Sequence, residues 1–266
     1  MAIVPARLAS TRLPRKMLLR ETGRYLFEHT YRNLEASELF ASVWLATDSE
    51  EIRAAAESSG VRALMTRADH ESGTDRVFEA WQRIATDAPA AGVRVIVNVQ
   101  GDEPDVARED LAALIRAFAD AAVEIATLAT PVASETDALA ANVVKVVCDA
   151  RGDALYFSRA PIPSRGHARA ELAGSAISTV HRRHVGVYAF APAALERFCS
   201  LPRGALEAHE NLEQLRWLEA GGKIRVVSAR HVPRGIDTRQ DYESFVARTQ
   251  RDGSGPAERK RAAEGR

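Results

Sequence analysis

Residues 93–104 read VRVIVNVQGDEP, an apolar run that ends in two adjacent carboxylates. Residues 93–99 have the length and the β-branched composition of a buried strand. Asp102 and Glu103 are costly at the end of such a strand unless something positive meets them there. Solvent, an arginine or a metal ion could meet them, and the rest of the sequence has to be considered to distinguish these possibilities.

Apolar runs alternate with helical patterns on both sides of this stretch. Strands are predicted at 2–4, 43–47, 61–66 and 93–99, and helices at about 25–36, 49–60, 73–85 and 108–120. This order, with strands that are apolar throughout, predicts an α/β fold whose parallel sheet is covered on both faces. Ser49 is expected to cap the second helix, and Thr74 or Asp75 the third.

The second half of the chain is less regular. It predicts a hairpin from 142–149 and 153–158, strands at 184–192 and 223–229, and a helix at 211–222. Residues 161–180 are rich in Pro, Ser and Gly and are expected to form a mobile loop. From 251 the sequence is polar and lacks an apolar face, which predicts a disordered tail over 251–266.

Composition excludes some classes of protein. The 266 residues include 36 Lys and Arg and 36 Asp and Glu, so the net charge of zero argues against a partner that is nucleic acid or a membrane surface. No apolar run approaches the roughly 18 residues of a membrane span, and no signal peptide is evident. Cys148 and Cys199 lie in apolar surroundings and are expected to be free thiols rather than a disulfide or a metal pair. A cytoplasmic protein is therefore expected.

Polar residues gather where the predicted strands end. Ligands of open α/β sheets bind beyond the carboxyl ends of the strands, which here carry residues 5–16, 47–51, 66–75 and 98–104. The first of these loops, PARLASTRLPRK, contains four cations, namely Arg7, Arg12, Arg15 and Lys16. A solvated basic cluster would explain them, but a loop after the first strand favours a site for polyanionic oxygens. Walker A and G-x-G-x-x-G patterns are absent, which disfavours an NTPase or a dinucleotide enzyme.

Two other turns allow two interpretations each. Ser-Gly-Thr at 72–74 could present backbone N–H groups to a base or phosphate, or could simply start a helix. In GIDT, residues 235–238, Asp237 could be a ligand carboxylate or an N-cap. The residues alone leave both alternatives open.

Together these segments resemble the 3-deoxy-manno-octulosonate (Kdo) cytidylyltransferase family, also called CMP-Kdo synthetases. The matching motifs run in order from about residue 2 to 247: PARLASTRLPRK, ATDSEEI, TRADHESGTDRV, VNVQGDEP, NVVKVV, ALYFSRAPIP, RRHVGVYAF, LEQLR and GIDT. The resemblance implies the nucleotide-diphospho-sugar transferase α/β fold, a mostly parallel sheet with a small dimerisation and sugar lobe at about 142–200 of a single domain, 1–250. It implies a homodimer that uses CTP, Kdo and Mg²⁺ to make CMP-Kdo and pyrophosphate for lipopolysaccharide synthesis.

The resemblance also assigns roles to residues. Lys16, Asp102 and Asp237 would be catalytic, with Asp102 and Asp237 binding Mg²⁺, which suits a cation that takes a few hard oxygens and keeps its waters. The residues that would bind CTP are Arg7, Ser10, Arg12, Lys16, Ser72 and Gly73. The residues that would bind the sugar acid are Gln100, Arg159, His184, Tyr188, Glu213 and Gln214. Without the family, His184 and Tyr188 would be interpreted as strand residues that pack into the second lobe.

The chain departs from the family pattern at Arg15, where the family usually has glycine. Arg15 could add a phosphate contact, which we favour, or could strain the loop if the position needs a positive φ. Residues 164–172 and 206–216 also differ and border the sugar pocket, so a transferase for 8-amino-Kdo stays open. STRLPRK argues against a sialic acid enzyme. Retention of Lys16, Asp102 and Asp237 argues against a non-catalytic nucleotide-sugar-binding protein.

Overall fold

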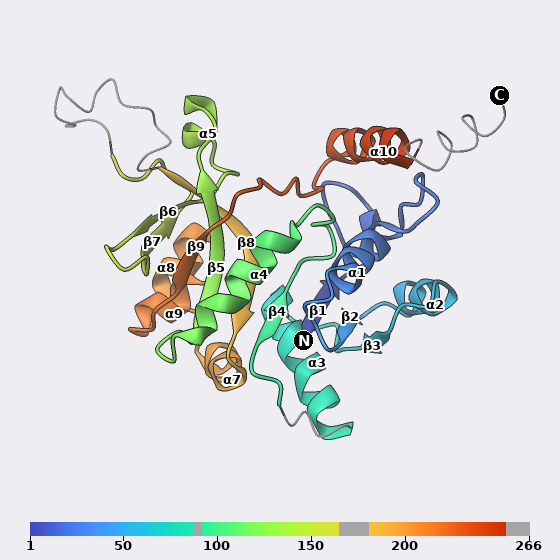
Figure 1. Cartoon of the computed structure of the whole chain (residues 1–266), viewed down its shortest axis with the longest axis horizontal. Helices are drawn as coiled ribbons and strands as arrows, with labels where there is room; N and C mark the ends of the chain where they lie inside the picture. The colour runs from blue at the N-terminus through green and yellow to red at the C-terminus, as the bar shows by residue number, and fades with distance from the viewer. Residues whose placement is uncertain (88–91, 165–180, 254–266) are drawn as a thin grey trace, which may run out of the picture.

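A single mixed sheet organises the part of the chain that the computed structural model describes, residues 1–87, 92–164 and 181–253 (Figure 1). Its nine strands include a path in the order β3-β2-β1-β4-β8-β5-β9, with β6 joined to β8 and β7 to β6. The strands are β1 Ala2–Ala6, β2 Val43–Thr47, β3 Ala63–Met65, β4 Ile96–Asn98, β5 Ile125–Pro131, β6 Lys145–Cys148, β7 Ala154–Ser158, β8 Arg182–Phe190 and β9 Arg225–Ser228.

The first four strands are parallel to one another, and β9 is parallel to β5. Strand β8 runs antiparallel between β4 and β5, and the β6–β7 hairpin extends the sheet beside it. The hairpin turns at Gly152, whose φ of 86° favours glycine. The predicted α/β fold with a mostly parallel sheet is confirmed, with the antiparallel pairs concentrated in its second half.

Helices cover both faces of the sheet. They are α1 Leu26–Ala36, α2 Glu50–Ser58, α3 Gly73–Asp87, α4 Arg108–Arg116, α5 Glu135–Leu139, α7 Pro192–Ser200, α8 Ala205–Glu210, α9 Leu215–Glu219 and α10 Arg239–Gly253, with 3₁₀ turns η1 Lys16–Leu18 and η2 Ala117–Ala119. Helices α1, α2 and α4 share one core, for which Phe27, Ile52 and Leu111 provide fully buried side chains. Helices α3, α7 and α9 share the core of the opposite face, which includes Val77 and Phe198. The result is a three-layer arrangement in which helices cover the apolar strands on both faces of the sheet.

The C-terminal helix α10 belongs to a third, smaller core. Leu13 and Leu26 from the N-terminal part pack there with Ile236, Tyr242 and Phe245. His29 of α1 meets the Phe245 ring edge-on, with ring centroids 4.9 Å apart. Burial, and then the nearby Arg24, lowers the pKa of His29 to about 4. Helix α10 therefore packs against the loop that follows β1, although the two are far apart in the sequence.

Several sequence predictions can be checked against these bounds. Strand 43–47 is confirmed to the residue, whereas β4 is three residues long instead of 93–99. Strand β5 and the short helices α5, α7 and α8 were not predicted. Helix α10 continues to Gly253, so the predicted tail is wrong for 251–253. The remainder of that tail and residues 165–180 of the predicted loop lie outside the described residues.

The two predicted helix caps had different outcomes. Ser49 caps α2 as predicted, because its Oγ accepts the N–H of Ile52 at 3.3 Å. The cap of α3 is Ser72, whose Oγ accepts the N–H of Asp75 at 3.1 Å, so the choice of Thr74 or Asp75 was wrong. Thr74 is buried two residues further on, in the same first turn, and its hydroxyl bonds to Glu213 instead.

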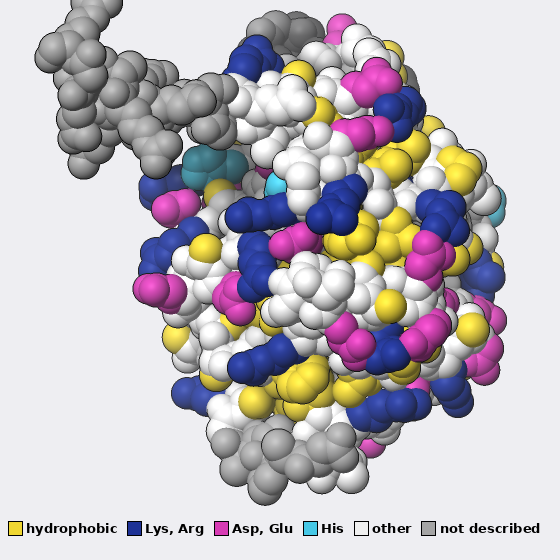
Figure 2. Space-filling model, turned by 90° about the vertical axis from the view of Figure 1, so that its right-hand side faces the viewer, with side chains coloured by type: hydrophobic (Ala, Val, Ile, Leu, Met, Phe, Trp, Pro, Cys, Tyr) yellow, Lys and Arg dark blue, Asp and Glu magenta, His cyan; other side chains and the backbone are white. Residues whose placement is uncertain are grey.

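The surface and the thiols agree with the composition. Acidic and basic side chains are interleaved over the face that carries α2 and α10 (Figure 2), as the balanced charge leads one to expect. Cys148 and Cys199 are free, although both are half-buried rather than buried. Within the described ranges, the helices are either too short or too polar to cross a membrane.

Candidate active site

A cavity of about 290 Å³ opens where the strand order reverses. Strand β2 lies on one side of β1 and β4 on the other, so their connections diverge and leave a crevice beyond the carboxyl ends. The lining residues come from the loop after β1, from the start of α3, and from the loops after β4 and before α10. They are Pro5, Ala6, Arg7, Ala9, Ser10, Thr11, Arg12, Lys16, Met17, His70, Glu71, Ser72, Gly73, Arg76, Gln100, Asp102 and Asp237.

Lys16 lies at the centre of the charged end of this cavity. The residue is 9% exposed, and its ammonium forms ion pairs with Asp102 and, at 3.3 Å, with Asp237. It also donates to the carbonyl of Ile236 at 3.1 Å. Arg12 reaches Asp237 from the solvent side at 3.0 Å. Two carboxylates from distant loops thus converge on one buried cation.

Backbone and core contacts hold these loops together. The N–H of Ile236 donates to the carbonyl of Asp102 at 3.0 Å, which joins the loop after β4 to the one before α10. The N–H of Glu21 donates to the Tyr242 hydroxyl at 2.9 Å, which joins the loop after η1 to α10. Asp237 is therefore positioned by a helix that packs on the loop carrying Lys16.

Glu103 adjoins Asp102 without lining the cavity, and the sequence analysis assigned it no role. Lys16 meets Asp102, whereas the Glu103 carboxyl packs over Gly235, where an added Cβ would lie 2.6 Å from Oε1. Burial, and then the charge of Asp102, raises the pKa of Glu103 to about 8. Its Oε2 is buried without a partner among the described residues. The adjacent carboxylates that raised the opening question thus have different environments.

All six residues predicted to bind CTP line the cavity, although their contact with a nucleotide stays a prediction. Arg15 is different, since it lies outside the lining and forms an ion pair with Glu51 of α2. Its backbone is left-handed, with φ 55° and ψ 27°. The favoured prediction of a phosphate contact therefore has no support in this geometry, and the alternative, a strained position suited to glycine, does.

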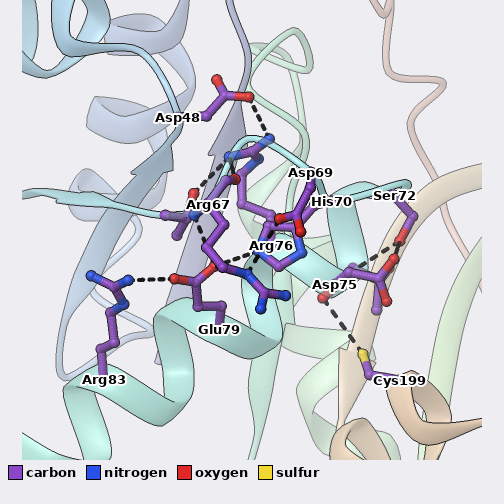
Figure 3. A network of polar contacts seen from close by, with 12 residues as sticks. Asp48, Arg67, Asp69, His70, Ser72, Asp75, Arg76, Glu79, Arg83 and Cys199 are labelled. Carbon is purple, nitrogen blue, oxygen red and sulfur yellow. Dashed lines mark hydrogen bonds and ion pairs between the residues drawn. The ribbon is translucent and has the colours of Figure 1, made fainter.

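A buried arginine of α3 bonds to residues that follow β2 and β3 (Figure 3). Arg76, 4% exposed, bonds to Asp48 at 2.8 Å, to Thr66 at 2.6 Å and to the carbonyl of Arg67 at 3.2 Å. The planar guanidinium, with several N–H donors in a fixed fork, can bond these three acceptors at once. Sequence analysis missed Arg76, although an arginine one turn into a helix that starts at a ligand-binding edge is a usable signal.

Glu79 is a second residue of α3 that anchors the segment before this helix (Figure 3). Its carboxylate accepts the backbone N–H of Arg67 at 2.9 Å and contacts Nε2 of His70. His70 also lines the cavity. The segment 67–72 is thus held from beneath by charged side chains of α3.

Two of the residues predicted to bind the sugar acid, Gln100 and Glu213, lie at the ends of one chain of hydrogen bonds. Gln100 donates to Asn98 at 3.2 Å, Asn98 donates to the Thr74 hydroxyl at 3.2 Å, and Thr74 donates to Glu213 at 2.6 Å. Burial raises the pKa of Glu213, against the effect of the Thr74 hydroxyl. Sequence analysis assigned no binding role to Asn98 or Thr74.

His184 and Tyr188 lie near this chain on β8. Their ring centroids are 5.3 Å apart, and Nε2 of His184 lies 3.0 Å from the hydroxyl of Thr127. Burial lowers the pKa of His184 to about 3, so its imidazole is neutral at pH 7. Burial, and then Glu213, raises the pKa of Tyr188. The two rings pack against each other on the strand as the residue-based interpretation expected, and the Tyr188 hydroxyl is buried without a partner among the described residues.

Three buried polar atoms around this region have no partner within the described residues: the Tyr188 hydroxyl, Glu213 Oε2 and Gln214 Nε2. Buried polar atoms in folded proteins are normally hydrogen-bonded, so such a group of three needs an explanation. A carboxylate, a hydroxyl and an amide together suit a ligand that carries several hydroxyl groups.

Arg159 is the predicted sugar residue that stands apart. Its guanidinium donates to backbone carbonyls, at 2.9 Å to Glu210 and at 3.1 Å to Ala141. Its own carbonyl accepts from the buried ammonium of Lys145 at 2.6 Å. Hydrogen bonds between Arg159 and the other predicted sugar residues are absent from the described part of the chain. The structure therefore places Arg159 beside the chain of contacts rather than in it.

Comparison with known proteins places the chain in a family. Residues 1–224 match the model of the cytidylyltransferase family. The 3-deoxy-manno-octulosonate cytidylyltransferases of Rhodopseudomonas palustris (strain BisB18) and Chelativorans sp. (strain BNC1) are 42% and 44% identical to this chain over 92% and 91% of its length, and 95% and 93% of theirs. The chain belongs to the 3-deoxy-manno-octulosonate cytidylyltransferase family.

A solved structure gives the same result. The structure of CMP:2-keto-3-deoxy-manno-octonic acid synthetase complexed with CTP superposes on this cytidylyltransferase with a TM-score of 0.84 and 36% identity, covering 94% of this chain and 98% of the other. The fold and the nucleotidyltransferase class are therefore established. The metal and sugar assignments depend on the residues themselves.

The residues at the charged end of the cavity fit a divalent cation with few protein ligands. Within the described ranges, groups of three or more His, Cys, Asp and Glu suited to hold a metal are absent. Asp102 and Asp237 supply two carboxylates on either side of a cationic group, Lys16. This donor set suits Mg²⁺, which takes one or two carboxylates and completes its shell with phosphate oxygens and water.

Proposed function

We propose that this cytidylyltransferase transfers CMP from CTP to the anomeric hydroxyl of Kdo and releases pyrophosphate. The observation that carries the proposal is the continuity of two half-sites. A cavity with Lys16, Asp102 and Asp237 at its charged end shares the first turn of α3 with the unsatisfied polar atoms around Glu213 and Tyr188. A nucleotide and a polyhydroxylated acid would meet at that turn.

The cationic residues would hold the triphosphate. Lys16 has the rigidity needed for this role, because it is buried and tied to both carboxylates and to the carbonyl of Ile236. Arg12 is less constrained, since its side chain is 63% exposed and, among the described residues, pairs with Asp237. Phosphoryl transfer of this kind needs no covalent enzyme intermediate, so the residues contribute positioning and charge stabilisation.

We propose Mg²⁺ as the cofactor, held by Asp102 and Asp237. When bound, the ion would neutralise charge on the phosphate oxygens. The carboxylates would exchange part of their pairing with Lys16 for the cation, which would leave the ammonium freer to contact a phosphate. Both effects favour attack at the α-phosphate.

The sugar acid would be recognised by a mixture of charge and hydrogen bonds. His184 is neutral at pH 7, so it can contribute hydrogen bonds but no positive charge to bind a carboxylate. Arg159 is the cation among the residues that we assign to the sugar, and it is the candidate partner of the sugar carboxylate. Tyr188, Glu213 and Gln214 would pair with hydroxyl groups through the atoms that lack partners.

We further propose a cytoplasmic homodimer that supplies an activated sugar for lipopolysaccharide synthesis. Free Cys148 and Cys199 suit a reducing compartment. Leu155 of β7 is 62% exposed, although β7 pairs with β6 at the edge of the sheet, and such a side chain suits a contact between subunits. Sedimentation of the protein and of its Leu155→Lys variant would test the dimer, which a monomeric wild type would contradict.

Pyrophosphate release tests the function directly. We expect release when CTP, Mg²⁺ and Kdo are all present, and none when any one is omitted. A panel with 8-amino-Kdo and sialic acid distinguishes the alternative sugar acids by kcat/KM. Tight CTP binding without pyrophosphate release on any sugar would instead identify a nucleotide-binding protein.

A further inference from the structure

The hydrogen bonds from Gln100 to Glu213 run in one direction. Gln100 donates to the Asn98 side-chain oxygen, which leaves the Asn98 amide NH₂ to donate to Thr74. The Thr74 hydroxyl, having accepted that bond, donates its own hydrogen bond to Glu213 Oε1. Each bond thus fixes the donor of the next, and such chains strengthen one another in a low dielectric.

The two middle residues of this chain are inaccessible. Thr74 is 0% exposed and Asn98 is 1% exposed, so a substrate in the cavity contacts neither. The two ends of the chain, Gln100 and Glu213, are both residues that we assign to the sugar acid. Their separation and orientation are set by the pair between them.

Thr74 also has a fixed backbone. It lies in the first turn of α3, between the cap formed by Ser72 with Asp75 and the buried guanidinium of Arg76, both of which Figure 3 shows. Ser72 and Arg76 line the nucleotide cavity. The side chains of Ser72 and Arg76 on this rigid turn therefore face the nucleotide cavity, and the side chain of Thr74 on the same turn faces Glu213.

We propose that Thr74, oriented by Asn98, is a positioning residue that aims Glu213 at the sugar acid and makes the sugar site depend on the same helix turn that lines the nucleotide cavity. Thr74 uses one carboxylate oxygen of Glu213 and leaves Oε2 without a partner among the described residues. Oε2 is then the oxygen available to a substrate hydroxyl. The proposal depends on the proposed function, because it assigns Glu213 to the sugar acid.

The test is Thr74→Val, which keeps the shape of the side chain and removes the hydroxyl. We expect the KM for Kdo to rise roughly 10- to 100-fold, as for the loss of one hydrogen bond to a charged group, while the KM for CTP stays within about twofold. Thr74→Ser restores the hydroxyl and should restore the KM for Kdo. Thr86→Val is the matched control, since Thr86 lies on the same helix, is exposed, and bonds the carbonyl of Gln82 at 2.9 Å.

The outcomes separate the possibilities. Unchanged KM for Kdo in Thr74→Val, or an equal rise of both KM values that Thr74→Ser does not reverse, would overturn the positioning role while the function stands. A wild type that releases no pyrophosphate with any sugar acid would overturn the function and the inference together. If Thr74→Val fails to fold by circular dichroism, the comparison of Thr74→Ala with Thr74→Ser gives the same decision.

Discussion

Arg15 provides a test in which the backbone and the side chain can be separated. The residue has φ 55° immediately before Lys16, and its guanidinium pairs with Glu51. A left-handed conformation costs a residue with a Cβ roughly 1 kcal/mol or more, whereas glycine adopts it freely. The ion pair opposes this cost only weakly, because side-chain exposures of 57% and 49% limit it to about 1 kcal/mol or less.

Comparison of Arg15→Gly with Arg15→Ala isolates the backbone term. Both variants lose the ion pair with Glu51, and only alanine keeps a Cβ in the left-handed conformation. We therefore expect Arg15→Gly to be more stable than Arg15→Ala by about 1 kcal/mol, which is roughly 2–4 °C in Tm for a chain of this size. Glu51→Gln removes the ion pair alone and should cost less than about 1 kcal/mol.

Thermal and urea unfolding measure these differences, and steady-state kinetics with CTP complete the test. Equal stability of the glycine and alanine variants, or lower stability of the glycine variant, would refute the strain. We expect the KM for CTP to change by less than about threefold in both variants, because the Arg15 side chain lies outside the cavity lining. A rise of about tenfold in both would show that the guanidinium reaches a phosphate in the bound enzyme.

The remaining predictions concern charge. Asp102→Asn and Asp237→Asn should each reduce kcat by roughly 100-fold or more, to effectively no turnover, while circular dichroism shows an intact fold. Near-normal pyrophosphate release at saturating Mg²⁺ by either variant would show that its residue does not bind the metal. Arg12→Ala and Lys16→Ala should raise the KM for CTP roughly tenfold and slow transfer, whereas unchanged kinetics in both would place the triphosphate elsewhere. His29 has a pKa of about 4 in the folded protein, below its unfolded value of 6.5, so between these pH values the unfolded chain binds one proton more than the folded chain. The stability that the neutral imidazole contributes is therefore complete above pH 6.5 and is lost as the pH falls towards 4. His29→Gln should reduce the slope of unfolding free energy against pH in that window by up to one proton, and an unchanged slope in urea titrations would contradict the assignment.

Local patterns were sufficient for the elements that are decided locally. Strand β2 and the Ser49 cap of α2 follow from a β-branched run and from a serine before a helix, and both were predicted. The cap of α3 was not, because Ser72, Thr74 and Asp75 all have suitable side chains. A residue 139 positions away decides between them, since Glu213 takes the Thr74 hydroxyl. Such a contact leaves no trace in the local pattern.

The arrangement of the second half was also beyond local patterns. Strand β5 was missed, and the sequence order did not reveal that β8 inserts between β4 and β5. That insertion places Tyr188 opposite Asn98 in register, and so brings the sugar residues to the end of β4. The sugar residues could be named only through the family resemblance, because each one alone resembles an ordinary core or loop residue.

The charged end of the site is assembled from both ends of the chain, which explains why one of its carboxylates was ambiguous in the sequence. The match to the family model ends at Ile224, before Asp237. Asp237 reaches Lys16 because α10 packs Tyr242 and Phe245 against Leu13. A GIDT turn before a helix usually means an N-cap, yet Asp241 accepts the N–H groups at this helix start and leaves Asp237 free to face Lys16. The N-cap is Thr238, whose Oγ1 accepts the N–H of Asp241 at 3.2 Å, and the carboxylate of Asp237 is available for the site.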